Sequence, residues 1–346
     1  MPFKIMAAGI KFRNNHQLIL NLLDPYDNIQ NHKSGFEWGR TNMKNITTKQ
    51  FQQLTDHQIV WDLLVENYGA GVKAPFFEYA LTSAWLDKRF LHLNRIWFDG
   101  EKAVAAVFYE DPYTNVYFSL KAGYEELAEE MVEYAEKFMP GSSREKMFIF
   151  HQEQQELIRA AEKMGYRRDH TDEAYEIEFD QSELNDPLPE GFHFVDPKHV
   201  DIVELARCTW KGFDHEGDKG PFEHWDVEDK GAYWSPQKAY LDIESSALAP
   251  PPHSTHELNV IIANEKEEYV CFSGMWWVPE NKLAYMEPLC TIPEYRHMGL
   301  AAAALSEHYR RMKKLGAECM TGGGNQFYKN IGYNKKVISY GYKKHF

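Results

Sequence analysis

The chain has 346 residues, of which 43% are hydrophobic and 26% charged, and 38 basic against 52 acidic residues give it a net charge of −14. These proportions are typical of globular proteins and exclude a disordered, collagen-like or low-complexity chain, and the length favours two domains. Nucleic-acid and anionic-membrane binding rely on clustered Lys and Arg, so an acidic chain argues against both.

No targeting or membrane segment is expected. Basic residues interrupt the short apolar stretches at the amino terminus, which disfavours a signal peptide, and no run of 18 apolar residues predicts a membrane span. The cysteines have no paired spacing and predict reduced, mostly buried thiols of a cytoplasmic protein. They are Cys208, Cys271, Cys290 and Cys319.

In chain order, the first half predicts two strands, at 102–110 and 115–120, joined by a turn. An amphipathic helix at 124–139 follows them, and a later helix closes in Gly-Tyr. The segment 181–192 contains two prolines and a glycine among polar residues, which predicts a linker.

The same order of elements recurs beyond this linker. Strands are predicted at 269–277 and 283–290, then a helix at 299–315, and then again a helix that closes in Gly-Tyr. This repetition predicts an internal duplication, with domains at 1–181 and 182–346.

The two halves differ in the loop before the amphipathic helix. The offset between corresponding residues rises from 167 at the first strands (269 − 102) to 175 at the helices (299 − 124). The longer loop contains Arg296-x-x-Gly299-x-Ala301, in which the glycine allows close backbone approach and the first helical amides can bind an anion such as a pyrophosphate. Neither a Gly-x-Gly-x-x-Gly nor a Walker pattern is present.

This loop and its surroundings resemble the central motifs of the GNAT superfamily of acyl-CoA-dependent N-acyltransferases. The family pattern x-Pro-x-Tyr-Arg-x-x-Gly-x-Gly/Ala, which follows a strand ending in a small or β-branched residue, corresponds to 291–301. A second family pattern, an Asn-containing helix with Tyr-x-x-x-Gly-aromatic, corresponds to Asn325 and to 328–333. The resemblance covers 258–346, and the first half resembles a degenerate copy that lacks the phosphate loop.

The resemblance implies an α+β fold, with a mixed, mostly antiparallel β-sheet flanked by helices, in two tandem GNAT-like domains. It also implies acetyl-CoA as the acyl donor, bound by the second domain. The residues that it assigns to this cofactor are Cys290, Thr291 and Ile292 at the pantetheine arm, Arg296, His297, Met298, Gly299, Leu300, Ala301 and Ala302 at the pyrophosphate loop, and Asn325 and Tyr328 beyond it.

Two side chains are the candidates for proton transfer. Tyr328 occupies the family's acid position and would protonate the leaving thiolate, although a core aromatic would also fit there. Glu287 would be the base, because partial burial raises a carboxyl pKa, although it could equally be a salt-bridged strand residue. His256 and Glu257 are second candidates for the base. Pro288 predicts either an interrupted strand ladder or an ordinary edge-strand proline.

The acceptor is expected to enter through the loops at 208–234 and 240–255. The first of these loops combines acidic residues with aromatics, which suits an organic amine but equally suits a helix core face with a charged outer side. The aromatics are Trp210, Phe213, Phe222, Trp225, Tyr233 and Trp234. The acidic run 214–218 and the nearby histidines, including His253, lack a recognised metal-ligand spacing and predict solvated loops without a metal.

Charge is unevenly distributed within the second half. Residues 182–280 contain 7 basic and 20 acidic residues, whereas 281–346 contain 11 basic and 4 acidic ones. We expect the basic part to face an anionic cofactor and the acidic part to attract a cationic acceptor. The sequence thus predicts an N-acetyltransferase for the primary amine of a small, cationic molecule, or alternatively a catalytically idle acyl-CoA-binding or scaffold protein, with the oligomeric state open.

Overall fold

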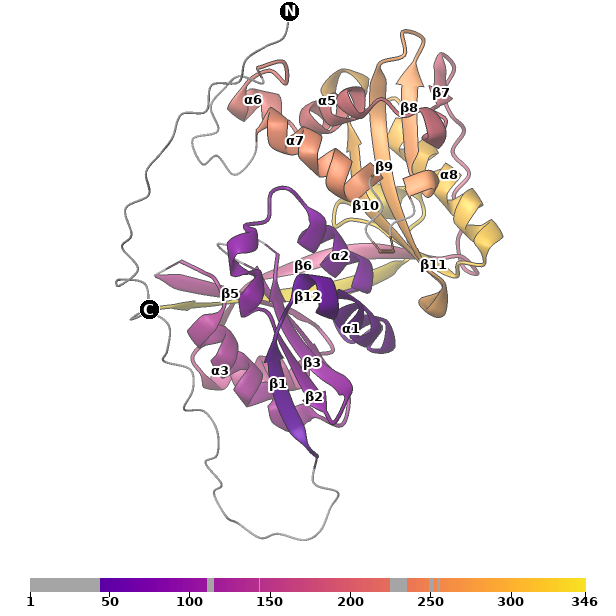
Figure 1. Cartoon of the computed structure of the whole chain (residues 1–346). Coiled ribbons are helices and arrows are strands. Elements are labelled where there is room, and N and C mark those ends of the chain that lie inside the picture. The colour runs from indigo at the N-terminus through magenta and orange to yellow at the C-terminus, as the bar shows by residue number, and fades with distance from the viewer. Residues whose placement is uncertain (1–43, 111–114, 143, 225–234, 249–251, 254–255) are drawn as a thin grey trace, which may run out of the picture. The chain divides into compact units, whose positions relative to one another are not determined.

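A computed structural model of the chain describes residues 44–110, 115–142, 144–224, 235–248, 252–253 and 256–346 (Figure 1). Several residues expected at the acceptor site, Trp225, Tyr233, Trp234 and Pro250-Pro251, lie outside this described part. No helix in the described part is long and apolar enough to cross a bilayer.

The first half contains six strands and four α-helices within its described residues. The strands are β1 (Ile46–Gln50), β2 (Arg95–Asp99), β3 (Lys102–Tyr109), β4 (Asn115–Leu120), β5 (Glu145–His151) and β6 (Arg167–Glu178), and the helices are α1 (Gln53–Glu66), α2 (Ala74–Thr82), α3 (Ala128–Phe138) and α4 (Gln155–Lys163). The predicted strands at 102–110 and 115–120 are confirmed as β3 and β4. Helix α3 begins four residues later than predicted because a 3-10 turn, Glu125–Leu127, precedes it.

The second half repeats this order. Its strands are β7 (Phe192–Phe194), β8 (Val260–Asn264), β9 (Tyr269–Val278), β10 (Leu283–Thr291), β11 (Cys319–Thr321) and β12 (Lys335–His345), and its helices are α5 (Ile202–Gly212), α6 (His215–Lys219), α7 (Pro236–Asp242), α8 (Leu300–Leu315) and α9 (Gln326–Ile331). Helix α8 ends where predicted, at Gly316, whose φ of 92° is strongly disfavoured for other residues.

The strands form one sheet in the order β1-β2-β3-β4-β5-β12-β6-β11-β10-β9-β8-β7. Neighbours pair antiparallel except for β4 with β5 and β10 with β11, and helices flank the sheet, so the predicted fold class is confirmed. The order is symmetric about its centre: each strand of the first half has its counterpart at the same distance from the middle.

The last strand of each half lies in the sheet of the other half. Strand β12 pairs with β5 from Ser339 opposite His151 to His345 opposite Glu145, and β6 pairs with β11 through Ile177 and Met320. The two exchanged strands also pair with each other. The boundary at 181/182 stays a prediction, but hydrogen bonds of the sheet cross it in both directions.

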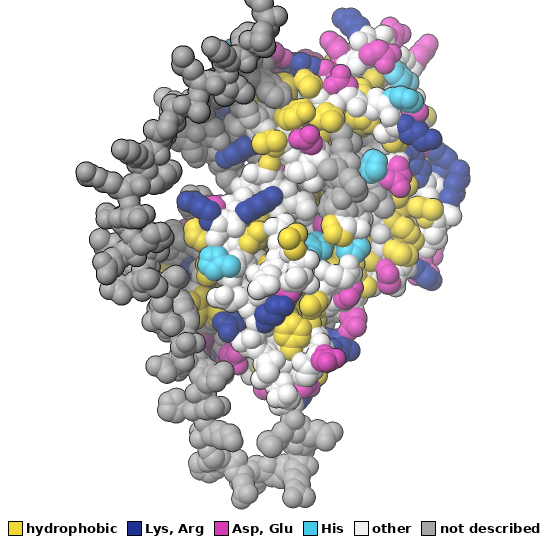
Figure 2. Space-filling model, in the orientation of Figure 1, with side chains coloured by type: hydrophobic (Ala, Val, Ile, Leu, Met, Phe, Trp, Pro, Cys, Tyr) yellow, Lys and Arg dark blue, Asp and Glu magenta, His cyan; other side chains and the backbone are white. Residues whose placement is uncertain are grey.

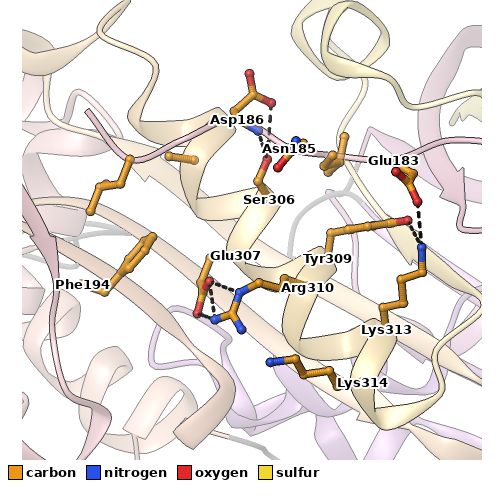
Figure 3. Close-up of a pocket in the computed structure, with 13 residues that line it drawn as sticks. Glu183, Asn185, Asp186, Phe194, Ser306, Glu307, Tyr309, Arg310, Lys313 and Lys314 are labelled. Atoms are coloured by element: carbon orange, nitrogen blue, oxygen red, sulfur yellow. Dashed lines mark hydrogen bonds and ion pairs between the residues drawn. The ribbon is translucent and has the colours of Figure 1, made fainter. Parts of the chain in front are cut away.

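The predicted linker runs along α8 (Figure 3). The Lys313 ammonium pairs with Glu183 at 3.0 Å, and Ser306 Oγ accepts a hydrogen bond from the Asp186 amide at 2.9 Å. A groove of about 570 Å³ lies between the linker and this helix face. The linker is therefore fixed to the second half by polar contacts along its length.

The cysteines are mostly buried, as predicted, and the predicted cytoplasmic location stays a prediction. All four are free thiols; Cys208, Cys271 and Cys290 are buried and Cys319 is partly buried.

Candidate active site

A bulge in β10 carries the predicted base. Met286 lies opposite Met275 of β9 and Leu289 opposite Ser273, so two residues, Glu287 and Pro288, face the single residue Gly274. A Cβ atom on Gly274 would lie 2.1 Å from the Glu287 carbonyl oxygen, so only glycine fits opposite the bulge. The ladder interruption predicted from the proline is confirmed. The edge-strand alternative is also met locally, because the described ladder between β10 and β11 ends at Ala284 and gives Pro288 no strand partner on that side.

Strands β10 and β11 diverge immediately before this bulge. Their parallel ladder contains only Leu283 with Cys319 and Ala284 with Met320. One further bond crosses the gap, from the Met286 amide to Thr321 Oγ1 at 2.8 Å. Beyond it, the described residues provide no strand partner for β10 on this side, so the strands open into a wedge that can admit an extended chain with its own hydrogen-bonding groups.

The backbone groups at the end of β10 differ in the direction that they face. The Ile292 amide donates to Val270 O at 3.0 Å, and the carbonyl of Thr291 accepts from Arg296 Nε at 3.0 Å. Because backbone groups alternate in direction along a strand, those of Cys290 also face β9. Of the three residues assigned to the pantetheine arm, Thr291 is thus the one whose backbone amide faces the wedge, and the assignment of Cys290 and Ile292 stays a prediction.

The predicted phosphate loop has the conformation of an anion site. His297 and Gly299 have positive φ values of 64° and 87°. Helix α8 starts at Leu300 with no side chain capping it and no acidic residue in its first turn. The amides of this first turn, which includes Ala301 and Ala302, therefore retain the positive end of the helix dipole. Met298, between the two left-handed residues, is 47% exposed.

Arg296 holds the loop in place. Its Nη2 atom lies 2.9 and 3.0 Å from the two carboxylate oxygens of Asp214, and 2.9 Å from the carbonyl oxygen of Gly212 at the end of α5. The guanidinium is thus already neutralised, and its role in the structure is to position the loop. Asp214 is solvent-exposed, as predicted for the run 214–218, and in addition pairs with Arg296; the Asp218 side chain lies outside the described part.

The basic side chains of α8 lie away from the phosphate loop. Figure 2 shows Lys and Arg side chains gathered at the edge of the molecule over this helix. Arg310 and Arg311 pair with Glu307. The two arginines lie at least about 15 Å along the helix axis from its start at Leu300. Cations at this end complement the negative pole of the helix dipole. The expectation that the basic part of the chain faces the cofactor is not met by these residues.

The predicted acid, Tyr328, lies in α9 and is 6% exposed. Its ring packs on two glycines, since Cβ atoms on Gly322 and Gly323 would lie 2.6 and 2.7 Å from it. Burial raises the pKa of the phenol, and the charge on Glu287 raises it further. The tyrosine is therefore protonated at neutral pH and can donate a proton. Asn325 caps α9 by accepting the Phe327 amide at 3.0 Å, so its carbonyl oxygen is used locally.

Glu287 has the environment of a general base. Burial raises its pKa to about 7, and the nearby carboxylate of Glu110 contributes to the rise. Glu110 follows β3 of the first half and accepts a hydrogen bond from the Tyr117 hydroxyl at 2.9 Å. Glu110 could not be predicted from the sequence, because nothing in its local pattern relates it to a strand of the other half. The alternative bases His256 and Glu257 instead pair with each other at 3.4 Å.

A cavity of about 370 Å³ connects the two halves beside this site. The second half contributes Tyr285, Thr321 and Gly322, the glycine on which Tyr328 packs. The first half contributes more of the lining, including Lys73, Tyr117, His151, His170, Asp172 and Glu176. None of the described residues of the loops at 208–234 and 240–255 lines this cavity, and the expectation that the acceptor enters through these loops stays a prediction.

The corresponding wedge of the first half is closed by side chains. Strand β4 has the place that β10 has in the second half. Its backbone carbonyl at Phe118 accepts a hydrogen bond from the Gln154 side-chain amide at 2.7 Å, and its backbone carbonyl at Leu120 accepts one from the Asn67 side-chain amide at 3.1 Å. The side-chain carbonyl of Gln154 also accepts a hydrogen bond from the backbone amide of His151 at 2.9 Å. These side-chain amides thus occupy backbone carbonyls of β4 with which an inserted chain would need to form hydrogen bonds.

The start of α3 is likewise unsuited to a phosphate. Glu125 accepts the Gly123 amide at 2.8 Å, directly before the helix. Glu129 and Glu130 lie in its first turn. Carboxylates thus occupy the position where α8 presents free amides, and they would repel an anion.

Comparisons with known proteins agree with this geometry. A family model described as acetyltransferase (GNAT) family matches residues 200–333, whereas no curated protein matches the chain. Among solved structures, a GCN5-related N-acetyltransferase from Sphaerobacter thermophilus is 13% identical with a TM-score of 0.54, covering 87% of this chain and 95% of that one. A tandem GNAT protein from the clavulanic acid biosynthesis pathway is 11% identical with a TM-score of 0.54, covering 87% of this chain and 98% of that one.

At such identities the solved structures show the fold alone. The fold is one shared with tandem GNAT proteins, and the sequence match adds the family of the second half, which supports acyl transfer in general. Residues 200–333 of this chain belong to the GNAT acetyltransferase family.

Proposed function

We propose that the protein transfers an acetyl group from acetyl-CoA to the primary amine of a small cationic molecule, by direct attack of the amine on the thioester. The observation that carries this proposal is the bulge of β10, which holds Glu287 where β10 and β11 diverge. The pKa of Glu287 is about 7, and its carboxylate is close enough to the Tyr328 phenol to raise the pKa of that phenol. A base and an acid thus lie at one end of an open wedge.

The donor would bind to the second half alone. Its pantetheine arm would extend along the wedge past Thr291, and its pyrophosphate would accept hydrogen bonds from the amides of the loop that ends at Gly299. Among its described residues the first half offers no equivalent position, because Gln154 and Asn67 cover β4 and carboxylates cover the start of α3. Free thiols at all four cysteines agree with a cytoplasmic location for this chemistry.

The chain's own residues would move two protons. Glu287 would accept the proton of the attacking ammonium group, which frees the nitrogen lone pair for bond formation with the thioester carbon. As the carbon–sulfur bond breaks, Tyr328 would donate its proton to the leaving thiolate. Near pH 7 about half of Glu287 is ionised and can accept a proton, because its pKa is about 7, and Tyr328 is protonated, because burial raises its pKa.

The acceptor class follows from charge. Asp172 and Glu176 line the cavity, and Glu110 accepts a hydrogen bond from the lining residue Tyr117. The one Lys or Arg in the described lining, Lys73, pairs with Glu176 at 3.3 Å. Such a field favours a molecule that carries positive charge in addition to the reacting amine.

Two measurements test this proposal. Isothermal titration should show acetyl-CoA binding to the full chain, which Gly299→Glu should abolish and Gly123→Glu should leave intact. These glycines precede corresponding helices and have matching φ values of 87° and 88°, so the second variant controls for backbone strain. Equal effects of the two variants would contradict the donor site.

The second measurement follows CoA release with panels of cationic, neutral and acidic amines. Turnover confined to cationic amines supports the proposal, and turnover that favours acidic amines contradicts the acceptor class. Acetyl-CoA binding without turnover on any amine would favour an idle acyl-CoA-binding protein instead.

A further inference from the structure

Three metal-ligating side chains converge away from the acyl-transfer site. They are His57 of α1, Glu78 of α2 and His253, which lies between α7 and β8. One ligand atom from each lies within 4.8 Å of the other two. The first half supplies two of these side chains and the second half supplies the third.

The carboxylate of Glu78 is oriented as metal ligands are. It is fully buried, and its Oε1 atom accepts hydrogen bonds from the His253 backbone amide at 3.1 Å and from Trp276 Nε1 at 3.3 Å. These two donors fix the carboxylate through one oxygen, as outer contacts do in metal sites. The other oxygen, Oε2, faces His253 Nδ1 at 2.7 Å and His57 Nε2 at 3.4 Å.

His57 supplies an independent indication of a ligand. The residue is 8% exposed, and within the described part of the chain neither of its ring nitrogens has a hydrogen-bond partner. Buried polar atoms of native proteins nearly always have a partner, and one without a partner requires an explanation. Its Nε2 atom faces Glu78, where a cation bound to the carboxylate would meet it.

We propose that His57, Glu78 and His253 bind one divalent transition-metal ion, with Zn²⁺ the best match to two imidazoles and a carboxylate. Ligand atoms about 2.1 Å from a tetrahedral ion lie about 3.4 Å from each other. The His57–Glu78 distance of 3.4 Å already fits, and the His253–Glu78 distance of 2.7 Å is that of a hydrogen bond whose proton the metal would replace.

The surroundings support one bound ion open to solvent. The ring of His253 stacks on Trp61 with centroids 3.7 Å apart and planes 7° from parallel, which limits its rotation. Its side chain is 22% exposed, so an ion has access and water can take the fourth position. Bound there, the ion would join α1 and α2 of the first half to the second half.

The test uses the full chain, freed of metal by chelation and dialysis. Co²⁺ added as a spectroscopic probe should give the visible absorption of a tetrahedral site, saturate at one ion per chain and be displaced by Zn²⁺. His253→Gln and His57→Gln should each weaken Zn²⁺ affinity at least tenfold, whereas His199→Gln, which removes an 80% exposed imidazole, should not change it.

Zn²⁺ should also raise the melting temperature of the unmodified chain by a few degrees and that of His253→Gln by none. If His57→Gln fails to fold, the partly exposed His253 still provides the comparison. Absence of stoichiometric Co²⁺ or Zn²⁺ binding would overturn the proposal, as would binding that both variants retain. Acetyl-CoA binding is measured separately and does not bear on this outcome.

Discussion

Removing the charge of Glu110 should shift the pH dependence of the reaction without removing the base. Two causes raise the pKa of Glu287 from 4.5 to about 7, burial first and the Glu110 carboxylate second. The smaller cause accounts for less than half of the rise, so Glu110→Gln should lower the pKa of Glu287 by about one unit or less.

The effect on rate follows from the ionised fraction of the base. At pH 6, a carboxyl with a pKa of about 7 is roughly one-tenth ionised, and one with a pKa of about 6 is half ionised. Glu110→Gln should therefore raise kcat/KM at pH 6 up to about fivefold and leave it nearly unchanged at pH 8. Because the base acts when deprotonated, the acid limb of the profile should move to lower pH.

The assay is the pH profile of kcat/KM for CoA release, measured with a cationic amine that turns over. Tyr117→Phe is the control, since it removes the hydroxyl that donates to Glu110 while it keeps the charge. Glu287→Gln should lower kcat by about 10²-fold or more and remove the acid limb. An acid limb that stays near pH 7 in Glu110→Gln, or one that persists in Glu287→Gln, would refute this reasoning.

Three further outcomes are expected. Gly274→Ala should destabilise the protein by about 2 kcal/mol and lower kcat, measured by urea unfolding and CoA release, because its Cβ would displace the Glu287 carbonyl. Tyr328→Phe should lower kcat about 10²-fold with an unchanged melting temperature, because only the hydroxyl is lost; full turnover would remove the acid role. Burial lowers the pKa of His308 from 6.5 to about 3, so the folded protein keeps this imidazole neutral where the unfolded chain protonates it. The free energy of unfolding therefore falls as the pH falls below 6.5. His308→Gln should spare about 2 kcal/mol of that loss at pH 5, measured by unfolding at pH 5 and 7.

Local features of the site could be predicted from the sequence. The phosphate loop depends on Gly299 and the start of α8, which are contiguous in the chain, and the bulge depends on Pro288 within a strand. Each of these is a backbone constraint imposed by one residue on its immediate neighbours. Tyr328 was predicted from its place in the family motif and Glu287 from its place in the strand together with an expected burial, and in the structure burial raises the pKa of each.

Contacts between the halves could not be predicted in this way. Glu110 is an acidic residue before a turn, and its relation to Glu287 arises only through the shared sheet. In the sequence Gln154 is likewise an ordinary polar residue before a helix. In the structure its side-chain amide donates a hydrogen bond to the Phe118 carbonyl and closes the wedge beside β4 in the first half. Arg296 matched the family motif, but its pairing with Asp214 depends on where α5 ends. Such pairings are set by the tertiary fold and leave no local pattern.

The exchange of β6 and β12 has a consequence for biosynthesis. On the ribosome, β5 emerges long before its neighbour β12, which includes the last strand residue, His345. The edge of β5 therefore stays unpaired until β12 has been synthesised, and an unpaired strand edge is a template for aggregation. Folding of the first half is thus coupled to synthesis of residues 335–345, and a product truncated before residue 335 would expose two such edges, at β5 and β6.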